Sequence, residues 1–313
     1  MRRLAYHPAM TDSPILLSAA QTAARLPYPA LLEEIVRLLG DASVQVPQRL
    51  VQPLAGGGSL FVMPASDSRV AMTKLITFTP ANAGTARATI QGDVVIFDIA
   101  SGERRLVLDG PTVTARRTAA VSVLAAQRLA PNTRGPLLIV GAGVQGKAHL
   151  DAFAEVLQVR EVVIASRSVS SALALVQHAQ ARGLQARVVQ DANTALADCP
   201  LAVTCTPAHG VVLGSLPRPD AFISAVGAFT PQMVELGPDL CRHFAQQGAV
   251  FVDTADASHE AGDLLQAGLD VSRFATLADV LAQGTQRPAG PVLFKSCGWA
   301  GWDLAAARTA LAR

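Results

Sequence analysis

The sequence predicts an α/β protein built on a doubly wound parallel sheet, with a mainly antiparallel domain before it. From residue 137 to 283, apolar segments of strand length alternate with segments whose apolar residues recur at helical spacing. Residues 45–108 alternate with a period of two instead, and glycine-rich turns separate the segments. A Gly141-x-Gly143-x-x-Gly146 motif joins the first strand of the alternating region to its first helix. Alternation of strands and helices is typical of a parallel sheet covered on both faces.

Composition fits a globular protein of about two domains. The chain has 313 residues, of which 50% are hydrophobic and 16% charged, and its net charge is +2. So small a charge, without a clustered basic patch, argues against a nucleic-acid partner. No run approaches the ~18 apolar residues of a membrane span. Pro8, Asp12 and Pro14 interrupt any apolar run near the N-terminus, so we expect no secretory signal and a cytoplasmic location.

Cysteine and histidine spacing indicates neither disulfides nor a metal. The four cysteines form no C-x-x-C pair, and the six histidines show no ligand spacing. We therefore expect inert, free thiols in a reducing compartment and no metal site.

The first domain is expected to begin with helices and continue as strands. Ser18 can cap a short helix that carries Leu26, and Pro29 suits the start of an amphipathic helix over 29–39. An Ala-rich helix over 112–129 leads out of the domain. The expected strands cover 45–54, 59–63, 70–78, 88–98 and 105–108.

The alternating region supplies the parallel sheet. Ligands bind such sheets outside the carboxyl ends of the strands, and the strand ends at 204–207 and 225–229 are of this kind. The last segment, 292–312, contains the strand-like VLFKS and an Ala-rich helix. The expected strands lie near 137–141, 161–166, 186–190, 201–205, 221–226 and 249–253, and the helices near 145–157, 168–182, 191–197, 237–247, 256–266 and 276–283.

The glycine motif has the flanks of a dinucleotide-binding turn. An apolar strand, Leu137 to Val140, precedes it, and a helical pattern follows. Its glycines allow a tight turn, close approach of a pyrophosphate, and close packing of helix on strand. The alternative is a glycine-rich structural turn. The expected phosphate contacts are Gly141, Gly143, Val144, Gln145 and Gly146.

The end of the next strand favours NADP(H). An NAD site usually carries Asp or Glu there, roughly 20 residues on, whereas this strand ends in Ser166-Arg167-Ser168. Arg167 can pair with a 2′-phosphate and the hydroxyls can donate to it. We therefore expect NADPH, with NADH weaker. The alternative is that Arg167 is a solvated charge at a strand end. Later strand ends should also contact the cofactor, through Thr206, Pro207, Val226 and Gly227.

A lysine inside the apolar segment VAMTKLITF requires an anionic partner. Burying Lys74 costs free energy unless the charge is paired. That partner can be a ligand or an internal carboxylate. For Arg49 and Arg117, the residues alone favour an internal ion pair or a surface charge.

An ordered series of short motifs resembles the ornithine cyclodeaminase/mu-crystallin family. The similarity runs from about residue 45 to the C-terminus. It implies a discontinuous α+β substrate-binding and dimerisation domain, residues 1–120 with 292–313 returning to it. A Rossmann-type NADP-binding domain over 121–291 and a homodimer are also implied. The motifs are P-Q-R at 47–49, M-P at 63–64, M-T-K at 72–74, P-A-N at 80–82, T-A-R-R-T-A-A at 114–120, G-A-G-V-Q-G at 141–146, A-V-G-A at 225–228, E-A-G-D at 260–263 and F-K-S-C-G at 294–298.

The resemblance assigns substrate contacts residue by residue. Arg49, Lys74 and Arg117 stand at the positions that hold the substrate carboxylate in the family, and Thr89 stands at a substrate-contacting threonine. The phase of R-T-A-A selects Arg117 rather than Arg116. Lys74 is also the candidate catalytic proton donor.

One departure from the family pattern concerns the reaction. Similar cyclodeaminases carry Asp after A-V-G-x, and Phe229 stands there in this chain. Phenylalanine cannot accept a proton or hold a second amine. The resemblance therefore implies an NADPH-dependent reductase of a small cyclic imine carboxylate, foremost Δ1-pyrroline-2-carboxylate, which gives L-proline. The alternatives are ornithine cyclodeamination or deamination like that of alanine dehydrogenase, and a non-catalytic NADPH-binding protein.

Overall fold

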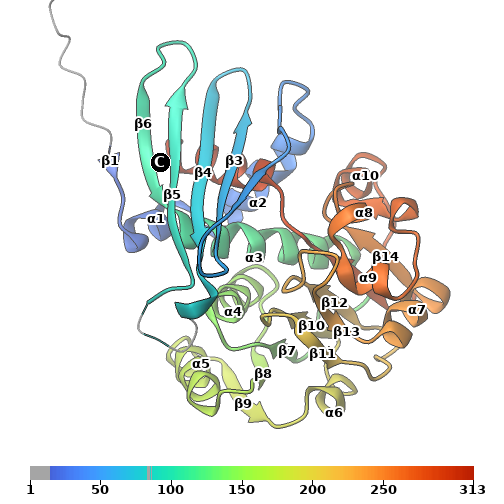
Figure 1. The fold of residues 1–313 in the computed structure, drawn as a ribbon. Helices are drawn as coiled ribbons and strands as arrows, with labels where there is room; N and C mark the ends of the chain where they lie inside the picture. The colour runs from blue at the N-terminus through green and yellow to red at the C-terminus, as the bar shows by residue number, and fades with distance from the viewer. Residues whose placement is uncertain (1–14, 83–84, 86) are drawn as a thin grey trace, which may run out of the picture.

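A computed structural model describes residues 15–82, 85 and 87–313. Residues 1–14, on which the expectation of no secretory signal rests, lie outside the described residues. The described chain forms two halves, one built on an antiparallel sheet and one on a parallel sheet (Figure 1). No helix among the described residues is long and apolar enough to cross a membrane.

The first half is a six-stranded sheet in the order β1-β6-β5-β4-β3-β2. Neighbouring strands are antiparallel except β1, which pairs parallel with β6. Successive side chains of a strand point to opposite faces of the sheet, so the buried Val70, Met72 and Ile76 share one face. Lys74 lies on that same face. The strands are β1 (Ile15–Leu16), β2 (Leu50–Pro53), β3 (Ser59–Ser66), β4 (Val70–Phe78), β5 (Ile90–Asp98) and β6 (Arg104–Asp109).

Helices cover one face of this sheet. They are α1 (Ala19–Arg25), α2 (Tyr28–Leu39), α3 (Gly110–Leu129) and the C-terminal α11 (Ala300–Leu311). Contacts join α11 to β3 and β4, α3 to β5, and α1 to β6. Within residues 15–82, 85 and 87–313, no helix covers the opposite face, and Leu75 of β4 is 44% exposed there. A short 3-10 helix, η1 (Pro80–Asn82), follows β4.

The long helix α3 runs between the two halves (Figure 1). Asp109 caps its start, because the carboxylate accepts from the backbone N–H of Thr112 at 2.9 Å. Its 20 residues contact α2 and α11 on one side and elements of the parallel half on the other. Side chains at intervals of three and four along α3 therefore reach the junction where both halves meet.

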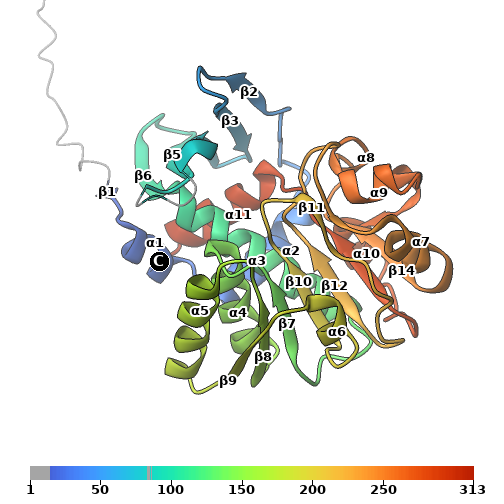
Figure 2. The same ribbon diagram turned by 60° about the horizontal axis from the view of Figure 1, so that its bottom comes forward.

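The second half is an eight-stranded parallel sheet in the order β15-β14-β16-β12-β10-β7-β8-β9. Figure 2 shows β7, β10 and β12 side by side near its centre. The chain proceeds outward from β7 through β8 to β9 and then returns to place β10 on the other side of β7. The crevice outside the carboxyl ends of β7 and β10 is thus a topological switch point, where such sheets bind ligands. The strands are β7 (Leu137–Val140), β8 (Glu161–Ala165), β9 (Gln185–Val189), β10 (Leu201–Thr204), β12 (Phe222–Ala225), β14 (Ala249–Val252), β15 (Ala275–Thr276) and β16 (Val292–Lys295).

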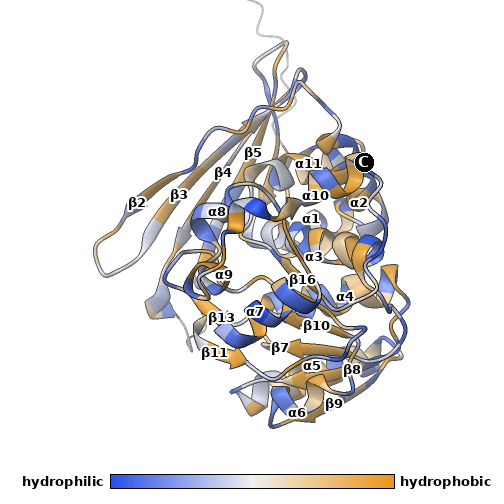
Figure 3. Ribbon diagram, turned by 90° about the vertical axis from the view of Figure 1, so that its right-hand side faces the viewer, coloured by the Kyte–Doolittle hydropathy of each residue, from blue (hydrophilic) through white to orange (hydrophobic). Residues whose placement is uncertain are grey.

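Both faces of this sheet are buried. In β7, Leu137 and Ile139 belong to one hydrophobic cluster and Leu138 and Val140 to another. This explains why the central strands are continuously apolar, as their hydropathy colouring shows (Figure 3). The helices are α4 (Val144–Val156), α5 (Val169–Ala181), α6 (Ala192–Leu196), α7 (Pro238–Gln247), α8 (Ala257–Glu260), α9 (Gly262–Gln266) and α10 (Leu277–Ala282), with a 3-10 turn η2 (Val271–Arg273).

Several elements differ from the sequence-based expectation. The strand expected over 45–54 forms only at β2, since Pro47 has no N–H for a ladder. β3 extends through Pro64, beyond the stretch that pairs with β2. Pro64 is therefore paired only with β4. The helix expected over 256–266 breaks at Ala261 into α8 and α9. A two-stranded sheet of β11 (His209–Leu213) and β13 (Val234–Leu236) was not expected.

The C-terminal segment divides between the two halves. β16, expected with the first domain, lies in the parallel sheet between β12 and β14. Only α11 packs on the first half, through α2, α3, β3 and β4. The loop between β16 and α11 therefore crosses the junction, which places residues 296–299 beside α3.

Candidate functional site

The glycine turn after β7 has the backbone geometry that only glycine adopts readily. Gly141 has φ +114°, and a Cβ there would lie 2.7 Å from the carbonyl oxygen of Cys205. A Cβ on Gly146 would overlap the carbonyl oxygen of Gly141. Gly146 thus lets α4 pack against the turn, and Gly141 lets the turn approach the end of β10.

The start of α4 fits an anionic ligand. Gly143 is its N-cap, no side chain caps the helix, and the first turn contains no acidic residue. Nothing lies within 4 Å of where a Cβ on Gly143 would be. The free N–H groups and the positive end of the helix dipole therefore face open space, as a pyrophosphate requires.

A cleft of about 890 Å³ lies beside this turn. Ser166, Arg167 and Ser168, from the end of β8, line it together with the glycine turn. Asp191 also lines the cleft, but its carboxylate is engaged in capping α6 through Asn193 N–H and the Thr194 hydroxyl. The other expected cofactor contacts on its wall are Gly141, Gly143, Val144, Gln145, Thr206 and Pro207.

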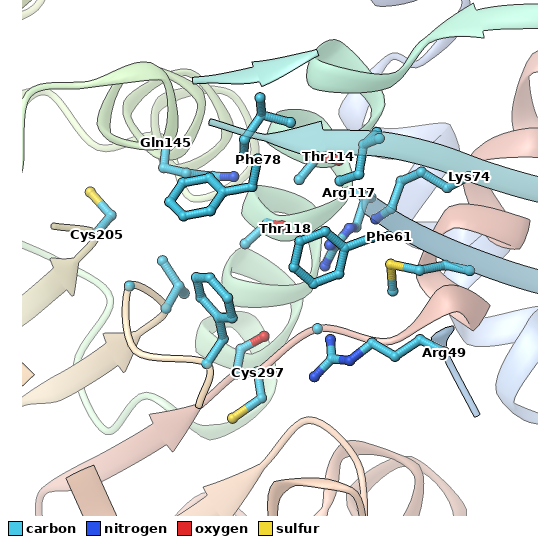
Figure 4. A pocket seen from close by; sticks show the side chains of 18 of the residues that line it. Arg49, Phe61, Lys74, Phe78, Thr114, Arg117, Thr118, Gln145, Cys205 and Cys297 are labelled. Atoms are coloured by element: carbon cyan, nitrogen blue, oxygen red, sulfur yellow. The ribbon is translucent and has the colours of Figure 1, made fainter. Parts of the chain in front are cut away.

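A smaller pocket of about 210 Å³ adjoins the cleft. Five residues line both, namely Ile90, Thr114, Gln145, Cys205 and Thr206. Figure 4 shows Arg49, Lys74 and Arg117 at one end of the pocket and Gln145 and Cys205 at the other, next to the cleft. A ligand in the small pocket would therefore have a basic end and an end facing the cleft.

Lys74 is fully buried at the basic end. Its phase along β4 directs it to the helix-covered face, where Asp303 of α11 lies. Lys74 Nζ is 2.7 Å from Asp303 Oδ2. Burial lowers the pKa of Lys74 to about 8, although the Asp303 carboxylate opposes this shift. A lysine with such a pKa can give up a proton near neutral pH.

Arg117 shares the same carboxylate. Its Nε is 3.2 Å from Asp303 Oδ1. Thr114, Arg117 and Thr118 lie on one face of α3 at helical spacing, and all three line the pocket. The guanidinium also lies close to Gly298, since a Cβ there would be 3.2 Å from Nη1. Glycine at this position leaves the guanidinium room beside the loop after β16.

Arg49 lies in the extended segment before β2 and forms an ion pair with Glu260 of α8. Burial raises the pKa of Glu260 to about 7, while Arg49 lowers it. The second carboxylate oxygen of Glu260 is buried without a hydrogen-bond partner. A neighbouring anion could therefore compete with Glu260 for the guanidinium.

Aromatic side chains form much of the remaining wall. Phe61 of β3 and Phe78 of β4 line the pocket (Figure 4). Phe229, after β12, lines it as well. Among the described residues that line it, none is Asp or Glu. The pocket thus combines paired cations at one end with phenyl rings around an apolar body.

Two buried carboxylates hold the loops between the cavities. Glu235 accepts from the backbone N–H of Thr206 at 2.6 Å and of Gly227 at 2.7 Å. Asp253 accepts from the N–H groups of Cys297 and Gly298. Each carboxylate fixes loops that line the small pocket.

The structure brings the expected residues together in two groups. The small pocket is lined by Arg49, Lys74 and Arg117. All three also pair with internal carboxylates, so both interpretations of these charges, as ligand contacts and as internal ion pairs, fit the structure. Thr89 lines the larger cleft instead of the small pocket. Val226 and Gly227 line the small pocket, and Gly146 packs beneath the turn.

The residues of the site that sequence reasoning missed include Asp303, Glu235, Phe61 and Phe78. A usable signal existed for Asp303, because a lone carboxylate within the Ala-rich helix over 300–311 needs a buried partner, as Lys74 does. Phe61 and Phe78 gave no signal beyond that of core residues.

The cysteines are free thiols. Cys205 and Cys297 line the pocket, and burial raises the pKa of both thiols. Thiols held in the protonated form are poor nucleophiles, so these cysteines act as small apolar wall residues. No group of three or more potential metal ligands occurs in the part of the chain that the structure describes.

The parallel sheet, the glycine turn at its switch point and the adjoining basic pocket define an α/β protein of the dinucleotide-binding class. More particularly, the chain belongs to the ornithine cyclodeaminase/mu-crystallin family, whose model matches residues 28–312.

Relatives of similar sequence cover most of the chain. Δ1-pyrroline-2-carboxylate reductase 2 of Burkholderia ambifaria is 40% identical over 93% of both chains. Ketimine reductase mu-crystallin of Mus musculus is 36% identical over 86% of this chain and 85% of the relative. The solved Δ1-pyrroline-2-carboxylate reductase of Thermococcus litoralis, in complex with NADH and L-proline, superposes with a TM-score of 0.87 at 22% identity. That superposition covers 95% of this chain and 96% of the other and shows a shared fold.

Proposed function

We propose that the protein is an NADPH-dependent reductase of cyclic imine carboxylates, with Δ1-pyrroline-2-carboxylate, reduced to L-proline, as the substrate. One observation supports the proposal: Lys74, Arg117 and Arg49 line the end of the small pocket away from Gln145 and Cys205, which it shares with the glycine-turn cleft (Figure 4). A ring carboxylate held by the cations would present its ring toward the cleft. The relatives named Δ1-pyrroline-2-carboxylate reductase support this substrate.

The charges around the pocket suit one carboxylate. Arg49 and Glu260 together carry no net charge when both are ionised, whereas Lys74, Arg117 and Asp303 carry +1. A single carboxylate would neutralise that cluster. Because charged groups in a dry site must be balanced, a substrate with a second carboxylate is disfavoured.

The residues around the larger cleft fit a dinucleotide. The uncapped start of α4 would hold the pyrophosphate, and Gly141 and Gly143 would let it approach the backbone. Arg167, with Ser166 and Ser168, supports NADPH over NADH, because its guanidinium can pair with the 2′-phosphate. When bound, the nicotinamide would supply the hydride that reduces the imine carbon.

The chain's residues would orient the imine and supply its proton. Arg117 and Arg49 would grip the carboxylate, and the phenyl rings would exclude water from the ring. Lys74, with a pKa of about 8, is mostly protonated at neutral pH and would donate its proton to the imine nitrogen. Solvent would then restore its proton. One hydride to carbon and one proton to nitrogen complete the reduction to the amine.

Phe229 separates this proposal from cyclodeamination. A cyclodeaminase must move protons to and from two amines near one point, which a carboxylate assists. Phe229 lines the pocket at the position where cyclodeaminases resembling this chain carry Asp. A phenyl ring leaves a second ammonium without a counter-ion.

Assembly and location follow as further parts of the proposal. Leu50, Val51 and Leu75 expose apolar side chains on the sheet half, and a two-fold homodimer would cover them. Four free thiols fit a reducing compartment, and we place the protein in the cytoplasm.

The proposal is tested by NADPH oxidation with a panel of cyclic imines and amino acids. We expect rapid, stoichiometric NADPH oxidation with Δ1-pyrroline-2-carboxylate and L-proline as product. NADPH binding without oxidation by any imine would favour a non-catalytic NADPH-binding protein instead.

A further inference from the structure

Asp303 is a buried carboxylate that pairs with two of the three cations at the basic end of the pocket, Lys74 and Arg117. It lies in the first turn of α11 and is fully buried. Its Oδ2 is 2.7 Å from Lys74 Nζ, and its Oδ1 is 3.2 Å from Arg117 Nε. The three charged groups come from β4, α3 and α11, which are far apart in the sequence. Their meeting point is therefore set by how α11 packs on the sheet.

This arrangement fixes the two cations relative to each other. Each oxygen of the carboxylate takes one cation, so the spacing between Nζ and the guanidinium follows from the carboxylate itself. Without Asp303, two buried positive charges would lie close together at the basic end of the pocket and repel. This repulsion would move the two groups apart, and Lys74 would lose its proton more readily.

Other buried ion pairs show what a purely structural role looks like. Arg308, also on α11, is bound by Asp67, Asp41 and Glu34 and lines neither cavity. That cluster fastens α11 to the N-terminal segments. Asp303 differs, because both of its partners line the pocket. Asp303 can therefore affect a ligand in the pocket through these two partners, in addition to attaching α11.

We propose that Asp303 is a positioning residue, which orients Lys74 and Arg117 for the substrate carboxylate and imine and keeps Lys74 protonated for proton donation. This inference rests on the proposed imine reduction. Asp303 does not line the pocket and acts through its two partners.

Charged side chains from three segments around Lys74 shift its pKa. Asp303 on α11 raises the pKa of Lys74, while Arg117 on α3 and Arg49 before β2 lower it, and burial lowers it most. The result is a pKa of about 8. Removal of the Asp303 charge takes away the largest influence that raises the pKa of Lys74. Glu260, with a pKa of about 7, is paired to Arg49 and is present in every variant at position 303.

The decisive variant is Asp303→Asn, which keeps the shape and removes the charge. For the unmodified protein, kcat/KM for Δ1-pyrroline-2-carboxylate should fall above pH 8 as Lys74 deprotonates. In Asp303→Asn we expect that fall to move about one to three pH units lower. Activity at pH 8 should then drop ~10-fold or more and recover partly toward pH 6.

Two further variants separate positioning from stability. Asp303→Glu keeps the charge but displaces it, so the fall in kcat/KM should stay near pH 8 while kcat decreases. Asp67→Asn breaks a buried pair with Arg308 of the same helix, α11, and should lower the melting temperature without moving the pH profile. If Asp303→Asn does not fold, Asp303→Glu decides, and an unchanged kcat in that variant would overturn the inference.

A binding measurement keeps this test independent of turnover. Calorimetry with pyrrole-2-carboxylate, a planar ring carboxylate, should show affinity that falls above pH 8 in the unmodified protein and at lower pH in Asp303→Asn. If the unmodified protein reduces no imine but the pH dependence of binding still moves in Asp303→Asn, the proposal of imine reduction is wrong and the effect of Asp303 on Lys74 stands. If neither pH profile moves in Asp303→Asn, Asp303 is structural only.

Discussion

Arg49 and Glu260 form an ion pair that joins the segment before β2 to α8 in the other half of the chain. Both side chains are 21% exposed, and Arg49 also lines the small pocket. Glu260 therefore holds a guanidinium that the substrate carboxylate would require. The raised pKa of Glu260 makes this pair sensitive to pH.

Glu260 should make folding stability fall as the pH rises. Its pKa is raised from 4.5 to about 7, so between these values the folded protein binds more protons than the unfolded chain. Stability from this group is complete below about pH 4.5 and is lost as the pH rises through about 7. Glu260→Gln removes the effect, so its melting temperature relative to the unmodified protein should be higher at pH 8 than at pH 5. Glu33→Gln, at an exposed residue of α2, controls for the removal of a carboxylate. The same difference at both pH values for Glu260→Gln would contradict the raised pKa.

Removal of the charge of Lys74 or of Arg117 should lower kcat/KM for the substrate without changing the affinity for NADPH. Lys74→Met and Arg117→Met each remove a charge-assisted contact worth about 1.5–3 kcal/mol, or ~10- to 150-fold in kcat/KM. Lys295→Met removes another buried lysine, which is paired to Asp263 and lines neither cavity. It controls for the loss of a buried ion pair. If both pocket variants keep normal efficiency, the carboxylate is bound elsewhere.

Cofactor preference should depend on Arg167. We expect NADPH to bind more than tenfold more tightly than NADH, about 1.4 kcal/mol, because only NADPH offers a phosphate to the guanidinium. Arg167→Ala should remove most of that preference, as measured by fluorescence titration with both cofactors. Arg160→Ala, at an exposed arginine before β8 outside the cleft, is the matched control. Equal affinities for both cofactors in the unmodified protein would refute this assignment.

The parallel sheet was predictable because its signals are local. Four apolar residues, a glycine turn and a helical pattern specify β7 and α4 without any distant contact. The break at Ala261 was not predictable, because it depends on Gly262, where a Cβ would overlap the carbonyl oxygen of Met233. β16 was placed with the wrong sheet, because strand order depends on packing between distant segments.

The site was predictable only in part, for the same reason. Lys74 stood out as a charge within an apolar strand, and its phase on β4 placed it on the buried face. Its partner is 229 residues away, since Asp303 reaches it only through the packing of α11. The pairing of Arg117 to the same carboxylate likewise has no local signal.

Assembly should depend on the uncovered face of the antiparallel sheet. Light scattering at micromolar concentration should give twice the 32.5 kDa mass of one chain. Leu75→Lys places a charge on that face and should shift the protein toward the monomer. Leu216→Lys, at a leucine 63% exposed in the other half, should leave the mass unchanged. The mass of a single chain for the unmodified protein would overturn the dimer.

The central claim is that this protein reduces a preformed cyclic imine and does not deaminate ornithine. Phe229 supports it, because a phenyl ring dries the pocket and strengthens the grip on the carboxylate but offers no acid or base for a second amine. The most direct measurement runs two assays on one preparation: NADPH oxidation with Δ1-pyrroline-2-carboxylate, and ammonia release from L-ornithine with NADP+ or NAD+. We predict rapid oxidation in the first and no ammonia in the second. Ammonia and proline formed from ornithine at rates comparable to imine reduction would contradict the account.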